Sequence, residues 1–205
     1  MPLGEKMNGI AETAKLYPHV KLGKNVIIED FCVIGAPFKG HGDEETVIGD
    51  NAVIRSHTVI YAGNKIGSDF QTGNKANIRE LNRIGDNVSI GTLSVVEHHI
   101  IIENDVRIHS QAFIPEYSIL RNHCWIGPNV VITNAKYPRS PKVKETLKGA
   151  IIEEYAKIGA NSTILPGVII GKNSLIGAGS VVTDNVQENH VVAGNPAVFI
   201  REIDY

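Results

Sequence analysis

The chain has 205 residues, 42% of them hydrophobic and 20% charged, so one domain of ordinary size with a packed core is expected. The formal net charge of -2 argues against nucleic acid as the main partner, because binding the phosphate backbone needs a concentrated basic surface. Without a long apolar run, a leader-like start or enough cysteines for a disulfide framework, we expect a reduced, cytoplasmic protein with no membrane partner.

The dominant feature is a six-residue repeat of aliphatic residues. Across residues 48–132 every sixth residue is aliphatic except Thr72, and the same spacing holds across 22–34 and 152–182. A period of six fits neither a helix nor a plain alternating strand, but it does fit a short strand followed by a turn. Three such units close a three-sided coil of about 18 residues, whose aliphatic anchors point inward and stack at strand spacing.

The position four residues after each anchor is often small or aliphatic. Both cysteines, Cys32 and Cys124, occupy this position. We therefore expect both to be buried core residues rather than reactive thiols.

The repeat divides the chain into three parts. Residues 1–21 show no clear repeat and are expected to form an irregular cap or short helix, and residues 188–205 a C-terminal tail. Residues 22–187 are expected to form about eight coils, interrupted by insertions near 40–47 and 138–151. Both insertions leave at the same corner, and loops gathered at one edge of a solenoid usually mark its binding face.

One column of corner residues beside the two insertions is polar. Glu80, His98, Glu116 and Asn134 follow one another 18 residues apart, which places them on successive coils. Turns normally hold Gly, Asp or Asn at such positions. A solvated edge is the alternative, but a histidine between carboxylates next to a long loop favours a site. The adjacent His99 is expected to point in a different direction from His98.

The pattern of an aliphatic residue, a glycine and then a small residue resembles the hexapeptide repeat. The segment V-V-A-G-N-P-A at 191–197 resembles the terminal motif of hexapeptide-repeat acyltransferases. These resemblances imply an all-β, left-handed parallel β-helix and a homotrimer. One outward column on this fold is mostly apolar and is expected to mark the subunit interface, with covering by the C-terminal tail as the alternative. This column consists of Val59, Asn77, Val95, Phe113 and Val131.

The segment V-I-T-N-A-K-Y-P-R-S at 131–140 resembles the Thr-Asn…Pro-Arg-Ser loop of nucleotide-sugar N-acyltransferases, which act on UDP- or dTDP-linked amino sugars in surface-polysaccharide biosynthesis. The resemblance implies acyl transfer, acetyl by default, with His98, Glu116 and Asn134 as catalytic residues. His98 would accept a proton, Glu116 would orient it or bond the amine, and Asn134 would meet the oxyanion. Alternatively, the amine needs no base and these residues only bind it. Such enzymes can carry Asp after the Asn, where this chain has Ala135.

The segment G-N-K-A-N-I-R-E at 73–80 resembles the Thr-Gly…Ile-Arg-Glu segment of several such transferases. This implies substrate binding by Asn77, Arg79, Glu80 and Glu97, with Arg79 on the diphosphate or, alternatively, paired with Glu97 on the next coil. Acyl-CoA is implied as a co-substrate along the C-terminal coils rather than a tightly bound cofactor. The residues expected to bind it are Gly159, Ala160, Lys172, Gly177, Ala178, Pro196 and Arg201.

Two other functions remain open, namely O-acetylation of a simple sugar or serine and a non-catalytic structural role. The terminal motif and the polar column argue against the structural role. A metal site is not expected, although the zinc-dependent γ-carbonic anhydrases share the repeat. They use three histidines at a spacing that His57, His98, His109 and His123 do not reproduce.

Overall fold

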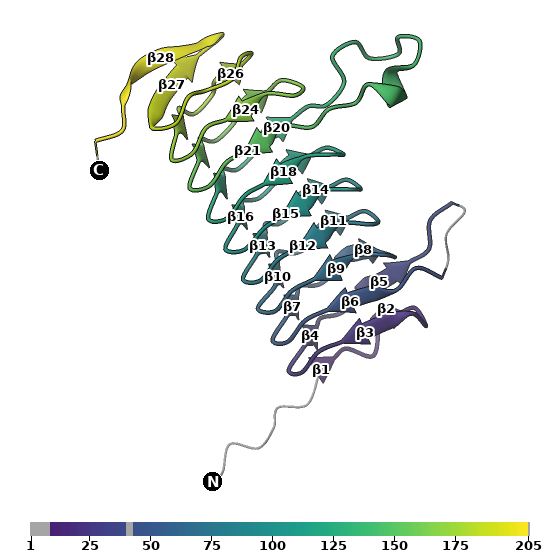
Figure 1. Ribbon diagram of the computed structural model, residues 1–205. Helices are drawn as coiled ribbons and strands as arrows, with labels where there is room; N and C mark the ends of the chain where they lie inside the picture. The colour runs from purple at the N-terminus through teal and green to yellow at the C-terminus, as the bar shows by residue number, and fades with distance from the viewer. Residues whose placement is uncertain (1–8, 40–42, 205) are drawn as a thin grey trace.

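Short parallel strands wind into a three-sided solenoid that runs the length of the molecule (Figure 1). The computed structural model describes residues 9–39 and 43–204. Within these ranges the strands stack into three sheets of 11, 9 and 8 strands, parallel except for the final pair β27–β28. The predicted all-β parallel β-helix of hexapeptide repeats is thereby confirmed.

Each sheet takes one strand from every coil in turn. The eleven-stranded sheet contains β1 (Gly9–Ile10), β4 (Ile27–Ile28), β7 (Val53–Ile54), β10 (Gln71–Thr72), β13 (Ser89–Ile90), β16 (Arg107–Ile108), β19 (Trp125–Ile126), β22 (Lys157–Ile158), β25 (Leu175–Ile176), β27 (His190–Gly194) and β28 (Ala197–Glu202). The nine-stranded sheet contains β2 (Lys15–Leu16), β5 (Val33–Ala36), β8 (Val59–Tyr61), β11 (Asn77–Ile78), β14 (Val95–Val96), β17 (Phe113–Ile114), β20 (Val131–Ile132), β23 (Thr163–Ile164) and β26 (Val181–Val182). The eight-stranded sheet contains β3 (Val20–Leu22), β6 (Thr46–Ile48), β9 (Lys65–Ile66), β12 (Arg83–Ile84), β15 (Ile101–Ile102), β18 (Ile119–Leu120), β21 (Ile151–Ile152) and β24 (Ile169–Ile170).

The aliphatic anchors form the core, as the repeat predicts. Ile60 is fully buried and pairs in register with Ile78, which pairs with Val96 on the following coil. Equivalent positions therefore lie directly above one another inside the prism. Cys32 and Cys124 are both buried in this core, as expected, and burial raises the pKa of the Cys124 thiol.

The corners share a backbone conformation that the aliphatic repeat does not predict. In most coils the residue three positions after an anchor takes a positive φ, even where it is His57 (63°), Leu81 (61°), His99 (57°) or Tyr117 (66°). This left-handed region is unfavourable for most L-residues and suits Gly, Asn and Asp best. Its recurrence with bulky residues shows that the stacking of coils, rather than local preference, imposes it.

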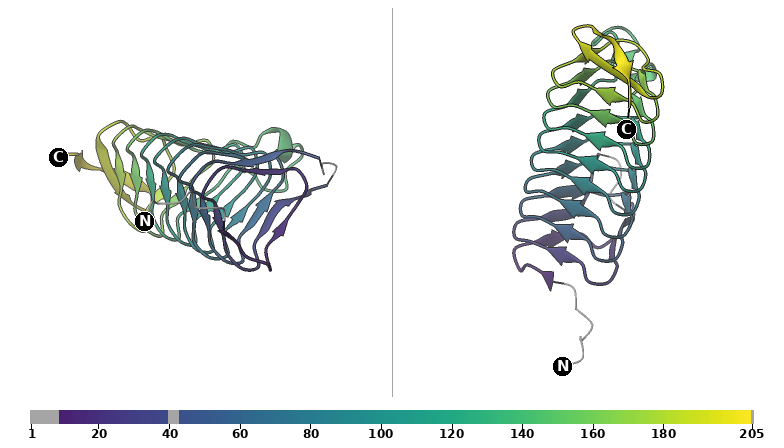
Figure 2. Two further views of the ribbon diagram at one scale, coloured as in Figure 1. Left: turned by 90° about the horizontal axis from the view of Figure 1, so that it is seen from below. Right: turned by 90° about the vertical axis from the view of Figure 1, so that its left-hand side faces the viewer.

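The solenoid begins earlier and ends later than the sequence predicts. Within residues 1–21, expected as a cap or short helix, β1, β2 and most of β3 form another coil that pairs with the next one. At the other end, β27 adds to β25 in parallel and β28 folds back on it, so much of segment 188–205 closes the eleven-stranded sheet. Figure 2 shows these two strands over the C-terminal end of the prism.

Both insertions connect the nine-stranded sheet to the eight-stranded sheet, at the corner predicted for them. Residues 40–42 of the first lie outside the described residues, and the described parts of both insertions project on the same side in Figure 1. The first links β5 to β6, and the end expected at residue 47 falls inside β6. The second links β20 to β21 and contains the 3-10 helix η1 (Val143–Glu145). Its expected end at residue 151 falls inside β21. No helix in the described part of the chain is long and apolar enough to cross a membrane.

Candidate functional site

The three predicted catalytic residues meet at the corner between the nine- and eight-stranded sheets. His98 follows β14, Glu116 follows β17 and Asn134 follows β20, so stacking brings together side chains from three coils. His98 Nε2 lies 3.6 Å from Glu116 Oε1, and Asn134 Nδ2 donates to Glu116 Oε2 at 2.6 Å. The His98 and Glu116 side chains are 26% and 24% exposed, so the group is half-buried yet reachable.

The sequence predicts that His98 and His99 point in different directions. In the structure their rings meet instead, with the two Nδ1 atoms 2.8 Å apart. The positive φ of His99 turns the chain so that the two adjacent rings meet. The ring of Tyr117, one coil further on, packs against both, with centroids 6.1 Å from that of His98 and 5.8 Å from that of His99. Both His99 and Tyr117 therefore belong to the candidate site, although the sequence did not predict them there.

A charged cluster lies below this group on the same corner. Arg79 Nε and Nη2 donate to the two carboxylate oxygens of Glu80 at 2.9 and 3.0 Å, and Nη1 donates to Glu97 at 3.3 Å. The guanidinium also lies 5.1 Å from the Tyr61 ring centroid. Burial raises the pKa of Glu97, which Arg79 partly opposes, and the hydrogen bonds to Glu80 raise the pKa of Arg79. The pairing with Glu97 on the next coil, predicted as the alternative to diphosphate binding, is present, together with a closer pairing to Glu80 that the sequence does not predict.

Two buried asparagines hold the backbone beneath the cluster. The side-chain amides of Asn64 and Asn82 both donate to the carbonyl of Arg79, at 2.7 and 2.9 Å. The Oδ1 of Asn82 accepts the N–H of Ile100, immediately after the histidine pair, at 2.7 Å. Both asparagines are 0% exposed, so these bonds tie the Arg79 turn to the His98 turn without contact with water.

The predicted substrate-binding residue Asn77 lies apart from this cluster. It sits in β11 on the outward column of the nine-stranded sheet, between Val59 and Val95. Of that column, Val131 is 39% exposed and the other members are half-buried in the single chain.

The predicted acyl-CoA residues fall in separate places. Gly159, Ala160, Gly177 and Ala178 stack at the corner between the eleven- and nine-stranded sheets, where a Cβ on Gly159 would lie 2.5 Å from the backbone nitrogen of Ala178. Pro196 follows a cis peptide bond between β27 and β28.

The two cations among the predicted acyl-CoA residues, Lys172 and Arg201, already have carboxylate partners. Lys172 Nζ lies 2.8 Å from Glu154, at the corner between the eight- and eleven-stranded sheets. Arg201 lies in β28 and pairs with Asp204 at 2.8 Å. The single chain therefore gathers the four glycine and alanine residues but not these two cations.

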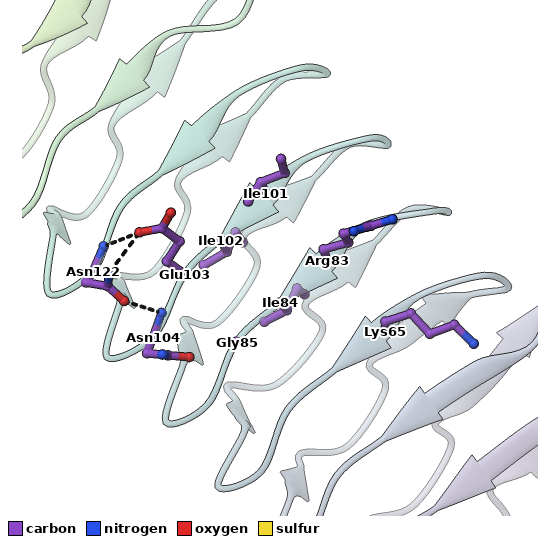
Figure 3. Close-up of a pocket in the computed structure, with 9 residues that line it drawn as sticks. All are labelled: Lys65, Arg83, Ile84, Gly85, Ile101, Ile102, Glu103, Asn104 and Asn122. Carbon is purple, nitrogen blue, oxygen red and sulfur yellow. Dashed lines mark hydrogen bonds between the residues drawn. The ribbon is translucent and has the colours of Figure 1, made fainter.

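A shallow groove runs across the eight-stranded sheet directly after the polar corner (Figure 3). Its two ends differ, because Lys65 and Arg83 project at one side while Glu103, Asn104 and Asn122 hydrogen-bond to one another at the other. None of the predicted catalytic residues lines it.

Across residues 9–39 and 43–204, no group of three or more His, Cys, Asp or Glu side chains is arranged to hold a metal ion.

Comparison with known proteins agrees with the repeat. The bacterial transferase hexapeptide (six repeats) family model matches residues 83–116 and 149–184. A galactoside O-acetyltransferase of Lactococcus lactis is 37% identical over 124 residues, 58% of this chain and 55% of that protein. The bifunctional protein GlmU of Exiguobacterium sibiricum is 31% identical over 180 residues, 88% of this chain and 37% of that protein. The chain thus spans about half the length, or less, of these relatives.

A solved structure similar to this chain is that of a GDP-perosamine N-acetyl transferase from Caulobacter crescentus in complex with CoA and GDP-perosamine. It is 18% identical, covers 97% of this chain and 58% of its own, and has a TM-score of 0.39. A likeness at this level carries no information about residues or substrates. The stacked hexads and the matched segments show hexapeptide repeats in this chain, which is similar to proteins named as acetyltransferases.

Proposed function

We propose that the protein is an acyl-CoA-dependent N-acyltransferase, acetyl by default, that acts on the amino group of a nucleotide-linked amino sugar. The observation that carries this proposal is the pairing of His98 and Glu116. Their Nε2 and Oε1 atoms are 3.6 Å apart, too far for a hydrogen bond to each other. One amine nitrogen placed against both can donate one N–H to each, which suits an amine better than a hydroxyl with its single proton.

The chemistry follows from that placement. The amine nitrogen attacks the thioester carbon, the N–C bond forms and the C–S bond breaks. The proton lost from nitrogen passes to His98 Nε2 and then to the thiolate sulfur of the departing coenzyme A. Glu116 is held by Asn134 through the 2.6 Å bond, so its carboxylate faces the imidazolium that forms and stabilises the charge. This bond supports a role for Asn134 in orienting Glu116.

The acceptor's negative charge fits the surroundings of the site. Two carboxylates offset the charge of Arg79 and Glu45 pairs with Lys65 at 3.0 Å, whereas Arg83 also lies along the adjacent groove. The charged residues of the long insertion are mostly basic: Lys136, Arg139, Lys142, Lys144 and Lys148, against Glu145 alone. A diphosphate-linked sugar suits these cations better than a neutral sugar does. The proposal includes acyl-CoA as the co-substrate. It also includes a homotrimer whose interface is the apolar column of the nine-stranded sheet.

A second candidate, O-acetylation of a simple sugar, is favoured by the identity to the galactoside O-acetyltransferase. The two are separated by measuring thiol release from acetyl-CoA with UDP-, dTDP- and GDP-linked amino sugars, the matching hydroxy sugars, galactosides and serine. We expect release with at least one amino sugar and a fall in kcat of about 10²–10⁴-fold in His98→Ala. Turnover restricted to hydroxyl acceptors would establish the second candidate, and near-parental turnover in His98→Ala would remove His98 from the mechanism.

A further inference from the structure

We propose that His99 is a positioning residue for His98. Its Nδ1 accepts a hydrogen bond from the Nδ1–H of His98 and so leaves the Nε2 of His98 as a lone pair facing the amine. This inference rests on the function proposed above, because it assigns the group that prepares His98 for proton transfer.

The distance between the two rings limits the arrangement of protons. The Nδ1 atoms are 2.8 Å apart, a hydrogen-bond distance that accommodates one proton between them. Either His98 donates to His99, or His99 donates to His98. In the first arrangement a neutral His98 has a free lone pair on Nε2, and in the second it carries its proton there.

The other side of His98 selects between these arrangements once the amine is bound. The carboxylate of Glu116 can only accept, and its second oxygen is already occupied by Asn134. An amine between Glu116 and His98 presents N–H groups to both, so Nε2 must accept as well. Glu116, the amine, His98 and His99 all find hydrogen-bond partners only in the arrangement in which His98 donates through Nδ1 to His99.

The fold holds His99 in place for this task. Its φ of 57° belongs to the corner position that takes the left-handed conformation in coil after coil, so its direction is set by the backbone. The Tyr117 ring packs against both imidazoles. Among the charged groups that face the pair, Glu116 lies 3.6 Å from Nε2 of His98, and Glu97 interacts electrostatically with His98.

The chain itself supplies matched variants. Leucine already occupies the equivalent position one coil earlier, as Leu81 with φ 61°, so His99→Leu removes the acceptor without demanding a new backbone conformation. His99→Asn tolerates the left-handed region and offers a side-chain oxygen that accepts from His98. His57→Leu makes the same substitution at the same coil position (φ 63°) of another corner and is the control.

Steady-state kinetics of the full-length protein test the inference. We expect His99→Leu to lower kcat by about 10- to 100-fold, because His98 loses the partner that keeps its Nε2 free to accept a proton. KM should change less than about twofold, because the proposal gives His99 no contact with the substrate. His99→Asn should recover most of the loss, and His57→Leu should match the parent. Parental kcat in His99→Leu, or equal losses in the Leu and Asn variants, would overturn the proposal.

Ring ¹⁵N chemical shifts separate this inference from the function itself. In the parent with amine substrate or an amine analogue bound, we expect His98 to carry its proton on Nδ1. In His99→Leu with the same ligand bound, we expect His98 to shift toward the form protonated on Nε2. A parent that transfers to no acceptor but shows the Nδ1 proton would refute the proposed function and leave the His98–His99 contact established. An Nε2-protonated His98 in the bound parent would overturn the contact's assigned direction.

Discussion

Arg79 sets the charge balance of the polar corner, because one guanidinium faces two carboxylates. It makes a two-pronged pair with Glu80, whose side chain is 8% exposed, and a longer contact with Glu97. Glu97 is therefore less well compensated than Glu80. Since burial raises the pKa of Glu97, its ionised form is held at a cost to folding.

This gives a stability prediction with a definite sign. The folded-state pKa of Glu97 lies above its ordinary value of 4.5, so the cost is absent below pH 4.5 and grows as pH rises through the folded-state pKa. Glu97→Gln removes the ionisation and can still accept from Arg79. We expect its Tm to exceed that of the parent at pH 7 and the difference to shrink toward pH 4 in thermal melts.

Glu45 provides a control of opposite sign. Hydrogen bonds from Lys21 and Lys65 lower its pKa, so its ionised form stabilises the fold above its ordinary pKa and loses that effect as pH falls through the folded-state pKa. Glu45→Gln should therefore lower Tm at pH 7 and have little effect in acid. A Glu97→Gln difference that is independent of pH would contradict the assignment.

The residues of the site were predictable only as far as spacing determines them. An 18-residue interval is enough to place His98, Glu116 and Asn134 on one column, and their atoms do meet. His99 escaped because its ring direction depends on a positive φ that comes from coil stacking. The pairing of Arg79 with Glu97 was among the alternatives, but its pairing with Glu80 was missed, since spacing gives neighbours but not which of them a flexible side chain contacts.

At the scale of strands, the close stacking of coils explains the glycine that follows many anchors. A Cβ added to Gly67 would lie 2.7 Å from the carbonyl carbon and oxygen of Gly85 on the next coil, although Gly67 needs no positive φ. Gly179 is the reverse, with φ of 72° and nothing within 4 Å of an added Cβ. At Gly67 a side chain would clash with the next coil, whereas at Gly179 it would only be strained by the backbone conformation.

These two glycines yield a paired prediction. Gly67→Ala must push two coils apart and should destabilise the protein by about 1–3 kcal/mol, as overpacking does. Gly179→Ala meets only backbone strain and should cost about 1 kcal/mol. Urea unfolding monitored by circular dichroism measures both. Equal costs, or a neutral Gly67→Ala, would show that the coils can separate more easily than the stacking implies.

The strands at the two ends were the least predictable elements. Ile10 and Leu16 do continue the six-residue spacing, but Ile10 is 42% exposed and two anchors alone do not stand out from chance. At the C-terminus, Val186 and Val192 continue the stack after a shortened connection from Val182, which shifts the register. A repeat is readable where many coils bury the same position, and it fades where the last coil has a neighbour on one side only.

At the scale of the whole molecule, a uniform prism carries one long non-uniform arm. The insertion between β20 and β21 leaves at Asn134 and returns at Lys148, where the N–H of Lys148 donates to the carbonyl of Asn134 at 2.9 Å. Its helix η1 has no buried residue, and Tyr137 is 66% exposed, so the arm contributes little to the core. It has one acidic residue, Glu145, among five basic ones. Its position beside His98, Glu116 and Asn134 suits a role in holding phosphate-bearing substrates.

Replacing residues 136–147 with Gly-Ser-Gly tests that role, because the Asn134–Lys148 bond already closes the neck. We expect a change in unfolding free energy below about 1 kcal/mol, since loop length affects closure entropy only weakly. KM for acyl-CoA or the nucleotide sugar should rise and depend less on salt, because the arm's cations attract phosphates through a screened field. A full-length arm with Lys136, Arg139, Lys142, Lys144 and Glu145 changed to Gln loses the same charges as the shortened arm and so separates charge from length. If charge is the cause, both variants show the same KM and salt dependence; if the neutral arm behaves like the parent, the arm acts by shape and this account of it is wrong.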